Sequence, residues 1–154
     1  MPNGRTAIEL SEAEQEELLR HARILQVASI NADGRPHLVP MWFEIDDEGV
    51  IVFTTYGTSQ KVVNLERDPR VTVLAETGSA YNELRGISID GRAEVVRDPH
   101  VTTRTLVIVG AKYNDRPRPA VPAEAPEPPP VAYKRVTVRI HPERIRTWDH
   151  RKLR

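Results

Sequence analysis

Two hydroxyls and a lysine lie close together in the segment that follows Gly57. Thr58, Ser59 and Lys61 stand there at the start of a predicted short helix. The N-terminus of a helix offers free backbone N–H groups and the positive end of the helix dipole. Together with two hydroxyls and an ammonium group, such a terminus can bind an anion, above all a phosphate. The alternative is an ordinary helix cap next to a surface lysine.

The elements on either side of this segment determine where its side chains point. Residues 50–55 are β-branched and aromatic, which is typical of a strand, and Gly57 ends that strand. Thr58 or Ser59 can cap the helix, and Asp68-Pro69 ends it before a second apolar strand over residues 71–74. The sequence therefore predicts that a turn between two strands carries the anion site.

The rest of the chain is predicted to be mostly strands. Ser11 and Glu14 form a capping box that starts a helix over residues 12–22. Pro40 cannot donate a ladder hydrogen bond, so its strand is bulged or lies at a sheet edge. Gly91 lies inside another strand and indicates a bulge or a close backbone approach. Further strands are predicted over 24–30, 37–45, 86–96, 136–140 and 144–148, with a turn at His141-Pro142 and a second helix from Asp98-Pro99 to Lys112.

These elements predict a mainly β fold, a six- to seven-stranded antiparallel barrel with short flanking helices. At 154 residues, the chain is expected to form a single domain over residues 1–154. A proline-rich segment over 113–132 contains seven of the 13 prolines and is predicted to be a polyproline-like loop. We expect this loop to be an excursion within the domain; a ligand for a proline-binding module is the alternative.

Composition excludes several classes of function. The 22 basic residues balance the 22 acidic ones, so no overall field favours nucleic acid or an anionic membrane. The chain has no cysteine, which rules out a thiolate ligand or nucleophile, and its five histidines lack metal-ligand spacing. No apolar run is long enough to span a bilayer, and the acidic N-terminus lacks the apolar core of a signal peptide. We therefore expect a cytoplasmic protein without a metal site.

The order and spacing of several motifs resemble the flavin-binding split β-barrels, the superfamily that includes pyridoxamine 5′-phosphate oxidases and the actinobacterial deazaflavin-dependent reductases. The resemblance runs from about residue 18 to residue 148 and implies an FMN-binding-like split barrel. The motifs that carry it are Gly-Thr-Ser-Gln-Lys at 57–61, Asn-Leu-x-x-Asp-Pro-Arg-Val at 64–71, Asp-Gly-Arg-Pro at 33–36, Val-Pro at 39–40 and Arg-Gly-Ile-Ser-Ile-Asp-Gly-Arg-Ala at 85–93.

This resemblance implies a homodimer that binds a flavin-like cofactor in a groove between two barrels. Arg85 would lie near the groove, from the same or the partner subunit, and Trp148 would either close over the ring or cover the barrel core. The remaining residues form two groups: Thr58, Ser59, Gln60 and Lys61 would hold the cofactor phosphate, and Val39, Pro40, Met41 and Trp42 would line one edge of the ring.

The resemblance ranks coenzyme F420 first as the cofactor and FMN second. The Gly-x-Ser-Gln-Lys and Glu-Leu-Arg-Gly-Ile segments look closer to the deazaflavin branch, and the chain lacks the longer C-terminal part of pyridoxamine phosphate oxidases. The implied activity is an F420-dependent oxidoreductase that transfers a hydride between the deazaflavin and a small organic substrate. An FMN-binding oxidase, a flavin or haem carrier without turnover, and a purely structural dimer are the alternatives.

Two further expectations concern proton transfer and the surface. No side chain needs to act as a nucleophile, and the candidates for a proton donor are His37, Tyr56 and Tyr81. Val39, Met41 and Phe43 are expected to form an exposed apolar patch that a second copy covers. The basic C-terminus, from Arg139 to Arg154, is either a solvated surface or an attraction for the polyglutamate tail of the deazaflavin.

Overall fold

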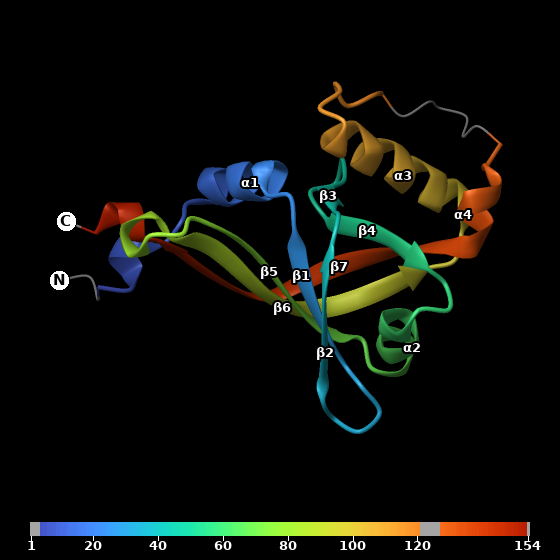
Figure 1. The fold of residues 1–154 in the computed structure, drawn as a ribbon, viewed down its shortest axis with the longest axis horizontal. Helices are drawn as coiled ribbons and strands as arrows, with labels where there is room; N and C mark the ends of the chain where they lie inside the picture. Colours follow the sequence, from blue (N-terminus) through green and yellow to red (C-terminus); the bar gives the residue numbers. More distant parts are fainter. Residues whose placement is uncertain (1–3, 121–126, 154) are drawn as a thin grey trace.

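Seven antiparallel strands form one curled sheet in the computed structural model, which describes residues 4–120 and 127–153 (Figure 1). The strand order is β2-β1-β5-β6-β7-β4-β3. The predicted mainly β, antiparallel split barrel with short helices is confirmed. The strands are β1 Leu25–Ile30, β2 Pro36–Met41, β3 Glu44–Ile45, β4 Ile51–Tyr56, β5 Arg70–Thr77, β6 Arg85–Val96 and β7 Arg135–Asp149.

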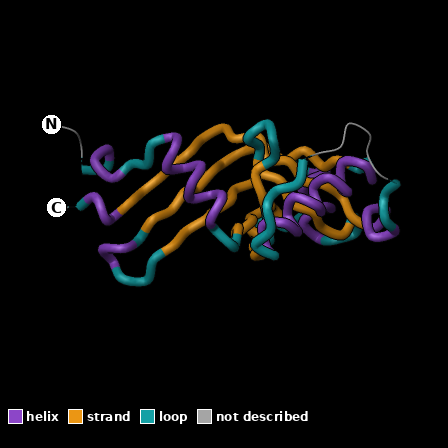
Figure 2. The backbone as a smooth tube through the Cα atoms, turned by 90° about the horizontal axis from the view of Figure 1, so that it is seen from above, coloured by secondary structure: helices purple, strands orange, loops and turns teal. Residues whose placement is uncertain are grey.

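Four α-helices flank the sheet: α1 Glu12–His21, α2 Gln60–Arg67, α3 Pro99–Tyr113 and α4 Pro130–Lys134. Short 3₁₀ turns occupy Thr6–Ile8, Tyr81–Glu83 and His150–Lys152. Seen from above, the long strands run away from the helix-rich end to the end where both termini lie (Figure 2). The molecule thus has a barrel end, which carries α2, α3 and α4, and an extended arm formed by β5, β6 and β7 (Figure 1).

The core fills the concave side of the curled sheet. Phe43, Phe53 and Val138 are fully buried, and Leu18 and Leu19 of α1 close the core from one side. The capping box predicted for α1 is present, because Glu14 N donates to the Ser11 hydroxyl and Ser11 N donates to the Glu14 carboxylate. Burial of these branched and aromatic side chains on one face of the strands stabilises the curled sheet.

Helix α3 forms despite its β-branched sequence because its threonines satisfy their hydroxyls locally. Thr103 and Thr105 donate to the carbonyls one turn earlier, at 2.7 and 3.1 Å. Thr102 and Thr105 also share hydrogen bonds with the buried Thr137 hydroxyl of β7, at 3.0 and 3.2 Å. The predicted start at Asp98-Pro99 is confirmed, since the Asp98 carboxylate caps the helix. Tertiary packing therefore outweighs the weak helix propensity of these residues.

The predicted single strand over 37–45 is two strands, because the chain leaves the ladder at Trp42 and Phe43. Tyr113, at the end of α3, fixes this break: its hydroxyl accepts from Phe43 N at 3.1 Å and its ring stacks on Trp42 at 4.3 Å. The Lys112 ammonium lies 3.7 Å from the centre of the Phe43 ring, and burial lowers the pKa of Lys112 to about 8. A contact from a helix 70 residues later in the chain therefore decides where β2 ends.

This break also corrects the expected apolar patch. Phe43 is fully buried, and Val39 and Met41 are half-buried on the inner face, whereas Leu38, Pro40 and Trp42 are exposed. The exposed side chains are therefore those one residue before each residue that the sequence predicted to be exposed. The edge position predicted for Pro40 is confirmed, since β2 pairs only with β1 and is the first strand of the sheet.

The predicted turn at His141-Pro142 is wrong, and residues 135–149 form one continuous strand. The ladder between β6 and β7 shifts register between Asp90 and Gly91, so a bulge absorbs Pro142 without ending the pairing. A Cβ added to Gly91 would lie 2.5 Å from the carbonyl oxygen of His141. The predicted close approach at Gly91 is thus confirmed.

The proline-rich segment predicted as a loop over 113–132 is structured at both ends. Tyr113 belongs to α3, and Pro130–Lys134 forms α4, with Pro130 at its first position, where a missing N–H is tolerated. Residues 127–129 lead into α4, and residues 121–126 lie outside the described part of the chain.

Two glycines should respond in opposite directions to the same substitution. In Gly86→Ala, the new Cβ would lie 2.2 Å from the Trp148 ring, so overpacking should lower the free energy of unfolding by about 1–3 kcal/mol. In Gly110→Ala, the new methyl of α3 meets nothing within 4 Å and should raise it by about 0.4–1 kcal/mol. Urea unfolding at one protein concentration measures both. Equal effects would contradict the packing of Trp148 on Gly86.

Candidate functional site

The turn after β4 is held by main-chain hydrogen bonds that fix the start of α2. Gly57 N donates to Lys134 O at 3.0 Å, and Ser59 N donates to Tyr56 O at 3.0 Å. Ser59 occupies the N-cap position, but its hydroxyl does not cap the helix; it lies 3.4 Å from the Thr55 hydroxyl. The predicted N-cap position at Ser59 is thus confirmed, but the hydrogen bond expected from its hydroxyl is absent. The first N–H groups of α2 remain available to a ligand because no side chain caps them.

Lys61 turns back from the first turn of α2 onto the end of β4. Its ammonium donates to the Thr55 hydroxyl at 2.9 Å, and no carboxylate contacts it in the part of the chain that the structure describes. Partial burial lowers the pKa of Lys61, and the positive charge of Arg135 lowers it further. A bound anion would raise this pKa again, because it would stabilise the partly desolvated ammonium group and offset the repulsion between the two cations.

Arg135, which sequence reasoning missed, is the second cation at this place. Its guanidinium donates to the Thr54 hydroxyl at 3.1 Å and to the Thr54 carbonyl at 3.3 Å, and it lies 4.6 Å from the centre of the Tyr56 ring. No ion pair of Arg135 occurs among the described residues. The pairing of Tyr56 with Arg135 in the β4–β7 ladder brings it here, and no local signal in the sequence indicates this long-range pairing.

Polar contacts tie α2 to the sheet below it. The Gln60 amide donates to the Asn64 side chain at 2.8 Å, and the fully buried Asn64 donates to Ser29 at 3.1 Å and to Asn31 at 2.9 Å. On the other side, Arg97 donates to Gly57 O at 3.2 Å while it pairs with Glu66. These contacts hold the helix start rigidly, so the Lys61–Arg135 site, defined by these two residues and the N-terminus of α2, needs little reordering to bind an anion.

The residues expected to line a ring lie along the outer edge of the sheet. Val39, Pro40 and Met41 belong to β2, whose second edge pairs with no described strand, and Trp42 follows at the break. The open edge leaves main-chain N–H and C=O groups available for a planar ligand. Trp42 is 58% exposed and is held by its stack on Tyr113.

Arg85 and Trp148 lie at the far end of the arm, away from the Lys61–Arg135 site. At the start of β6, Arg85 pairs with Asp149 and Gly86 pairs with Trp148. Just past the other end of β6, Arg97 contacts Gly57 beside the Lys61–Arg135 site. A 12-residue strand at about 3.3 Å per residue is roughly 40 Å long, so one chain does not bring the two groups together. Arg85 Nε lies 3.3 Å from the buried Asp149 carboxylate, which also pairs with Arg151.

The three candidate proton donors lie in three different places. Tyr56 lies at the Lys61–Arg135 site, where the Arg135 guanidinium lies against its ring. Nδ1 of His37, on β2, is buried without a hydrogen-bond partner among the described residues. Tyr81 is 73% exposed at the tip of the arm, next to His150.

The basic C-terminus is largely neutralised by ion pairs within the chain. Arg139 contacts Asp46, Glu48 and Glu94, and the pairs Arg146–Asp90, Arg151–Asp149 and Lys152–Glu14 account for three more cations. Such a surface has little attraction left for a polyanionic tail.

The described residues contain neither a cluster of metal ligands nor a membrane-spanning helix. No three or more histidine or acidic side chains converge in a way that could hold a metal ion in residues 4–120 and 127–153. None of the helices described is long and apolar enough to cross a membrane.

Comparison with known proteins identifies relatives in sequence and in fold. A 5a,11a-dehydrotetracycline/5a,11a-dehydrooxytetracycline reductase of Streptomyces rimosus is 32% identical over 126 residues, which cover 80% of this chain and 72% of the reductase. The structure of a conserved hypothetical protein of Mycobacterium tuberculosis is similar with a TM-score of 0.84 and 41% identity, over 98% of this chain and 92% of the other.

A solved structure described as an F420 reductase is also similar, with a TM-score of 0.64 and 26% identity over 94% of this chain and 98% of that one. The family model described as pyridoxamine 5′-phosphate oxidase matches residues 11–149, which include every strand of the sheet. This chain therefore belongs to the pyridoxamine 5′-phosphate oxidase family of flavin-binding-like split barrels.

Proposed function

We propose that this chain is an F420-dependent reductase that transfers a hydride between the deazaflavin and a small organic substrate. The observation that carries the proposal is the Lys61–Arg135 site, where two cations without carboxylate partners among the described residues lie at the N-terminus of α2. Membership of a flavin-binding-like family, the similarity to an F420 reductase and the reductase relative support the choice of reaction.

The chain's own residues would bind and orient the cofactor. Lys61, Arg135 and the first N–H groups of α2 would hold a phosphate, and the open edge of β2 from Val39 to Trp42 would contact the ring. When bound, a deazaflavin supplies two-electron hydride chemistry, since carbon replaces the N5 of flavin. His37 lies on β2, the same strand that would contact the ring, and its buried Nδ1 has no hydrogen-bond partner among the described residues. His37 is therefore our candidate to donate a proton to the product.

FMN stays the second candidate, because the proposed phosphate site contains a second cation that the sequence alone did not indicate. From the sequence, the phosphate group would meet one lysine and two hydroxyls, a weak clamp that suits the phosphodiester of F420 better than the dianionic monoester of FMN. Arg135 beside Lys61 strengthens the clamp, and the paired C-terminal cations offer little to a polyglutamate tail. The preference for F420 therefore depends on the similarity to the F420 reductase and on the open side of β2.

The cofactor preference can be measured directly on the purified protein. We expect protein from a host that lacks the deazaflavin to be colourless, to bind F420 in the low-micromolar range and to bind FMN at least several-fold more weakly. Difference spectra with each cofactor measure both affinities. Yellow protein with stoichiometric FMN would instead support an FMN oxidase or carrier.

Removal of the Lys61 ammonium should weaken binding without unfolding the protein. A charge-assisted hydrogen bond to phosphate is worth about 1.5–3 kcal/mol, so Lys61→Ala should reduce cofactor affinity roughly ten- to a hundredfold. Lys134→Ala is the matched control, because it removes a nearby exposed cation whose side chain makes no hydrogen bond or ion pair among the described residues. Equal affinities for the two variants would mean that the phosphate binds elsewhere.

We also propose a homodimer with the cofactor groove at its interface. Leu38 and Trp42 are 64% and 58% exposed at the open edge of the sheet, where a second copy could cover them. A second copy is also needed if Arg85 or Trp148 is to reach a cofactor held at Lys61, because one chain keeps them apart.

Sedimentation at micromolar concentration tests the dimer. We expect a species of about twice 17.4 kDa, and Leu38→Lys should shift it toward monomer by placing a charge in the interface. Val107→Lys, on an exposed part of α3 away from β2, should leave the dimer unchanged. A single monomeric species for the unmodified protein, with and without cofactor, would contradict this proposal.

A further inference from the structure

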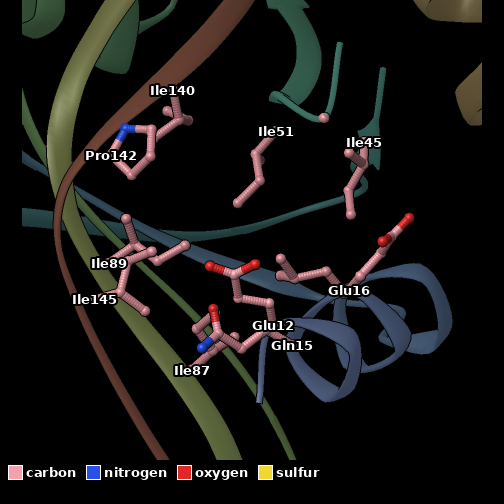
Figure 3. Close-up of a pocket in the computed structure, with 12 residues that line it drawn as sticks. Glu12, Gln15, Glu16, Ile45, Ile51, Ile87, Ile89, Ile140, Pro142 and Ile145 are labelled. Atoms are coloured by element: carbon pink, nitrogen blue, oxygen red, sulfur yellow. The ribbon is translucent and has the colours of Figure 1, made fainter. Parts of the chain in front are cut away.

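A cavity of about 240 Å³ lies between α1 and the mouth of the curled sheet (Figure 3). Six of the ten isoleucines of the chain line it, together with Leu19 and Pro142. Five of the six are at most 5% exposed, so the cavity reaches well below the surface. The six isoleucines are Ile45, Ile51, Ile87, Ile89, Ile140 and Ile145, from β3, β4, β6 and β7.

Helix α1 supplies the polar side of this cavity. Glu12 and Gln15 point toward the isoleucines of β6 and β7, whereas Glu16 lies at the edge of the cavity and points away from them (Figure 3). Glu16 pairs with Arg20 at 2.8 Å, and the Gln15 amide donates to Leu10 O at 3.1 Å. Glu12 has neither an ion pair nor a hydrogen bond within the described residues. The cavity therefore combines a deep aliphatic wall with one carboxylate that pairs with no cationic side chain among the described residues.

The isoleucine cavity is separate from the Lys61–Arg135 site. Ile51 begins β4 and lines the cavity, whereas Tyr56 ends the same strand beside Arg135. Five steps along a strand correspond to about 16 Å, and the packed Phe53 lies between the two ends. The two sites also differ in charge, since acidic side chains border one and basic side chains the other.

We propose that the isoleucine cavity binds a small organic ammonium compound with an aliphatic or alicyclic body. Its volume exceeds the roughly 150 Å³ of an apolar cavity that accepts benzene, so a compact hydrocarbon body fits. The isoleucines would cover that body, and the Glu12 carboxylate would attract the ammonium group at the mouth. A small molecule fits better than a protein surface, because only a compact group can enter the cavity and contact its buried isoleucines.

The test uses 1-adamantylamine as the probe and neutral 1-adamantanol as its match in shape, with cofactor-free protein labelled at the isoleucine δ1 methyls. We expect the amine to shift the methyls of the six cavity isoleucines and to leave Ile24, Ile30 and Ile108 unchanged. An exposed ion pair is worth up to about 1 kcal/mol, so the amine should bind about three- to fivefold more tightly than the alcohol.

Two variants of α1 separate the charge from the cavity. Glu12→Gln should reduce the preference for the amine to less than twofold, whereas Glu17→Gln, which removes the same charge outside the cavity, should retain it. Ile89→Phe should abolish the shifts by filling the space; if it does not fold, Ile145→Phe at the exposed rim replaces it.

Three results would overturn the proposal. Methyl shifts spread over all ten isoleucines, or no shifts at a millimolar concentration of the amine, would mean that the cavity is not a binding site. A preference for the alcohol, or one that Glu12→Gln leaves unchanged, would deny the cationic class. Cavity methyl signals that change with protein concentration alone would mean that a second copy fills the space. No cofactor is present, so failure of F420 binding would leave this result unaffected.

Discussion

The pairing of β4 with β7 is the constraint on which the rest of the structure depends. Six consecutive residue pairs join these strands, from Ile51 with Ile140 to Tyr56 with Arg135. One face of this ladder contributes Phe53 and Val138 to the core, and the other carries Thr137 toward the threonines of α3. A slip by one residue would exchange the two faces and would remove Arg135 from its place beside Thr54.

Because β7 continues past its bulge into the arm, it also connects the two regions that a cofactor groove would combine. The same strand that begins with Arg135 at the Lys61–Arg135 site carries Trp148 near its other end. Gly91 permits this continuity, since its missing side chain leaves room for the carbonyl of His141 at the bulge. Within one copy, the barrel end and the arm are therefore linked by a continuous strand instead of a loop.

The sequence predicted the elements whose signals are local and missed the features that depend on distant contacts. Three helix ends have signals that span at most four residues each, and the structure contains all three. They are the capping box at Ser11, the end of α2 at Asp68-Pro69 and the start of α3 at Asp98. The break at Trp42 depends on Tyr113, and the second cation depends on the β4–β7 register. His141-Pro142 reads as a turn locally, but the partner strand supplies the bulge that keeps the chain extended.

The open edge of β2 has a consequence for how this protein behaves at high concentration. Unpaired main-chain groups along an edge strand are also a template for a strand of another molecule, and sheets exposed in this way tend to aggregate. Pro36 and Pro40 remove two donors from β2, and the opposite edge, β3, is only two residues long. The sheet thus keeps an edge that a planar molecule can approach while offering a growing fibril too few donors to extend it.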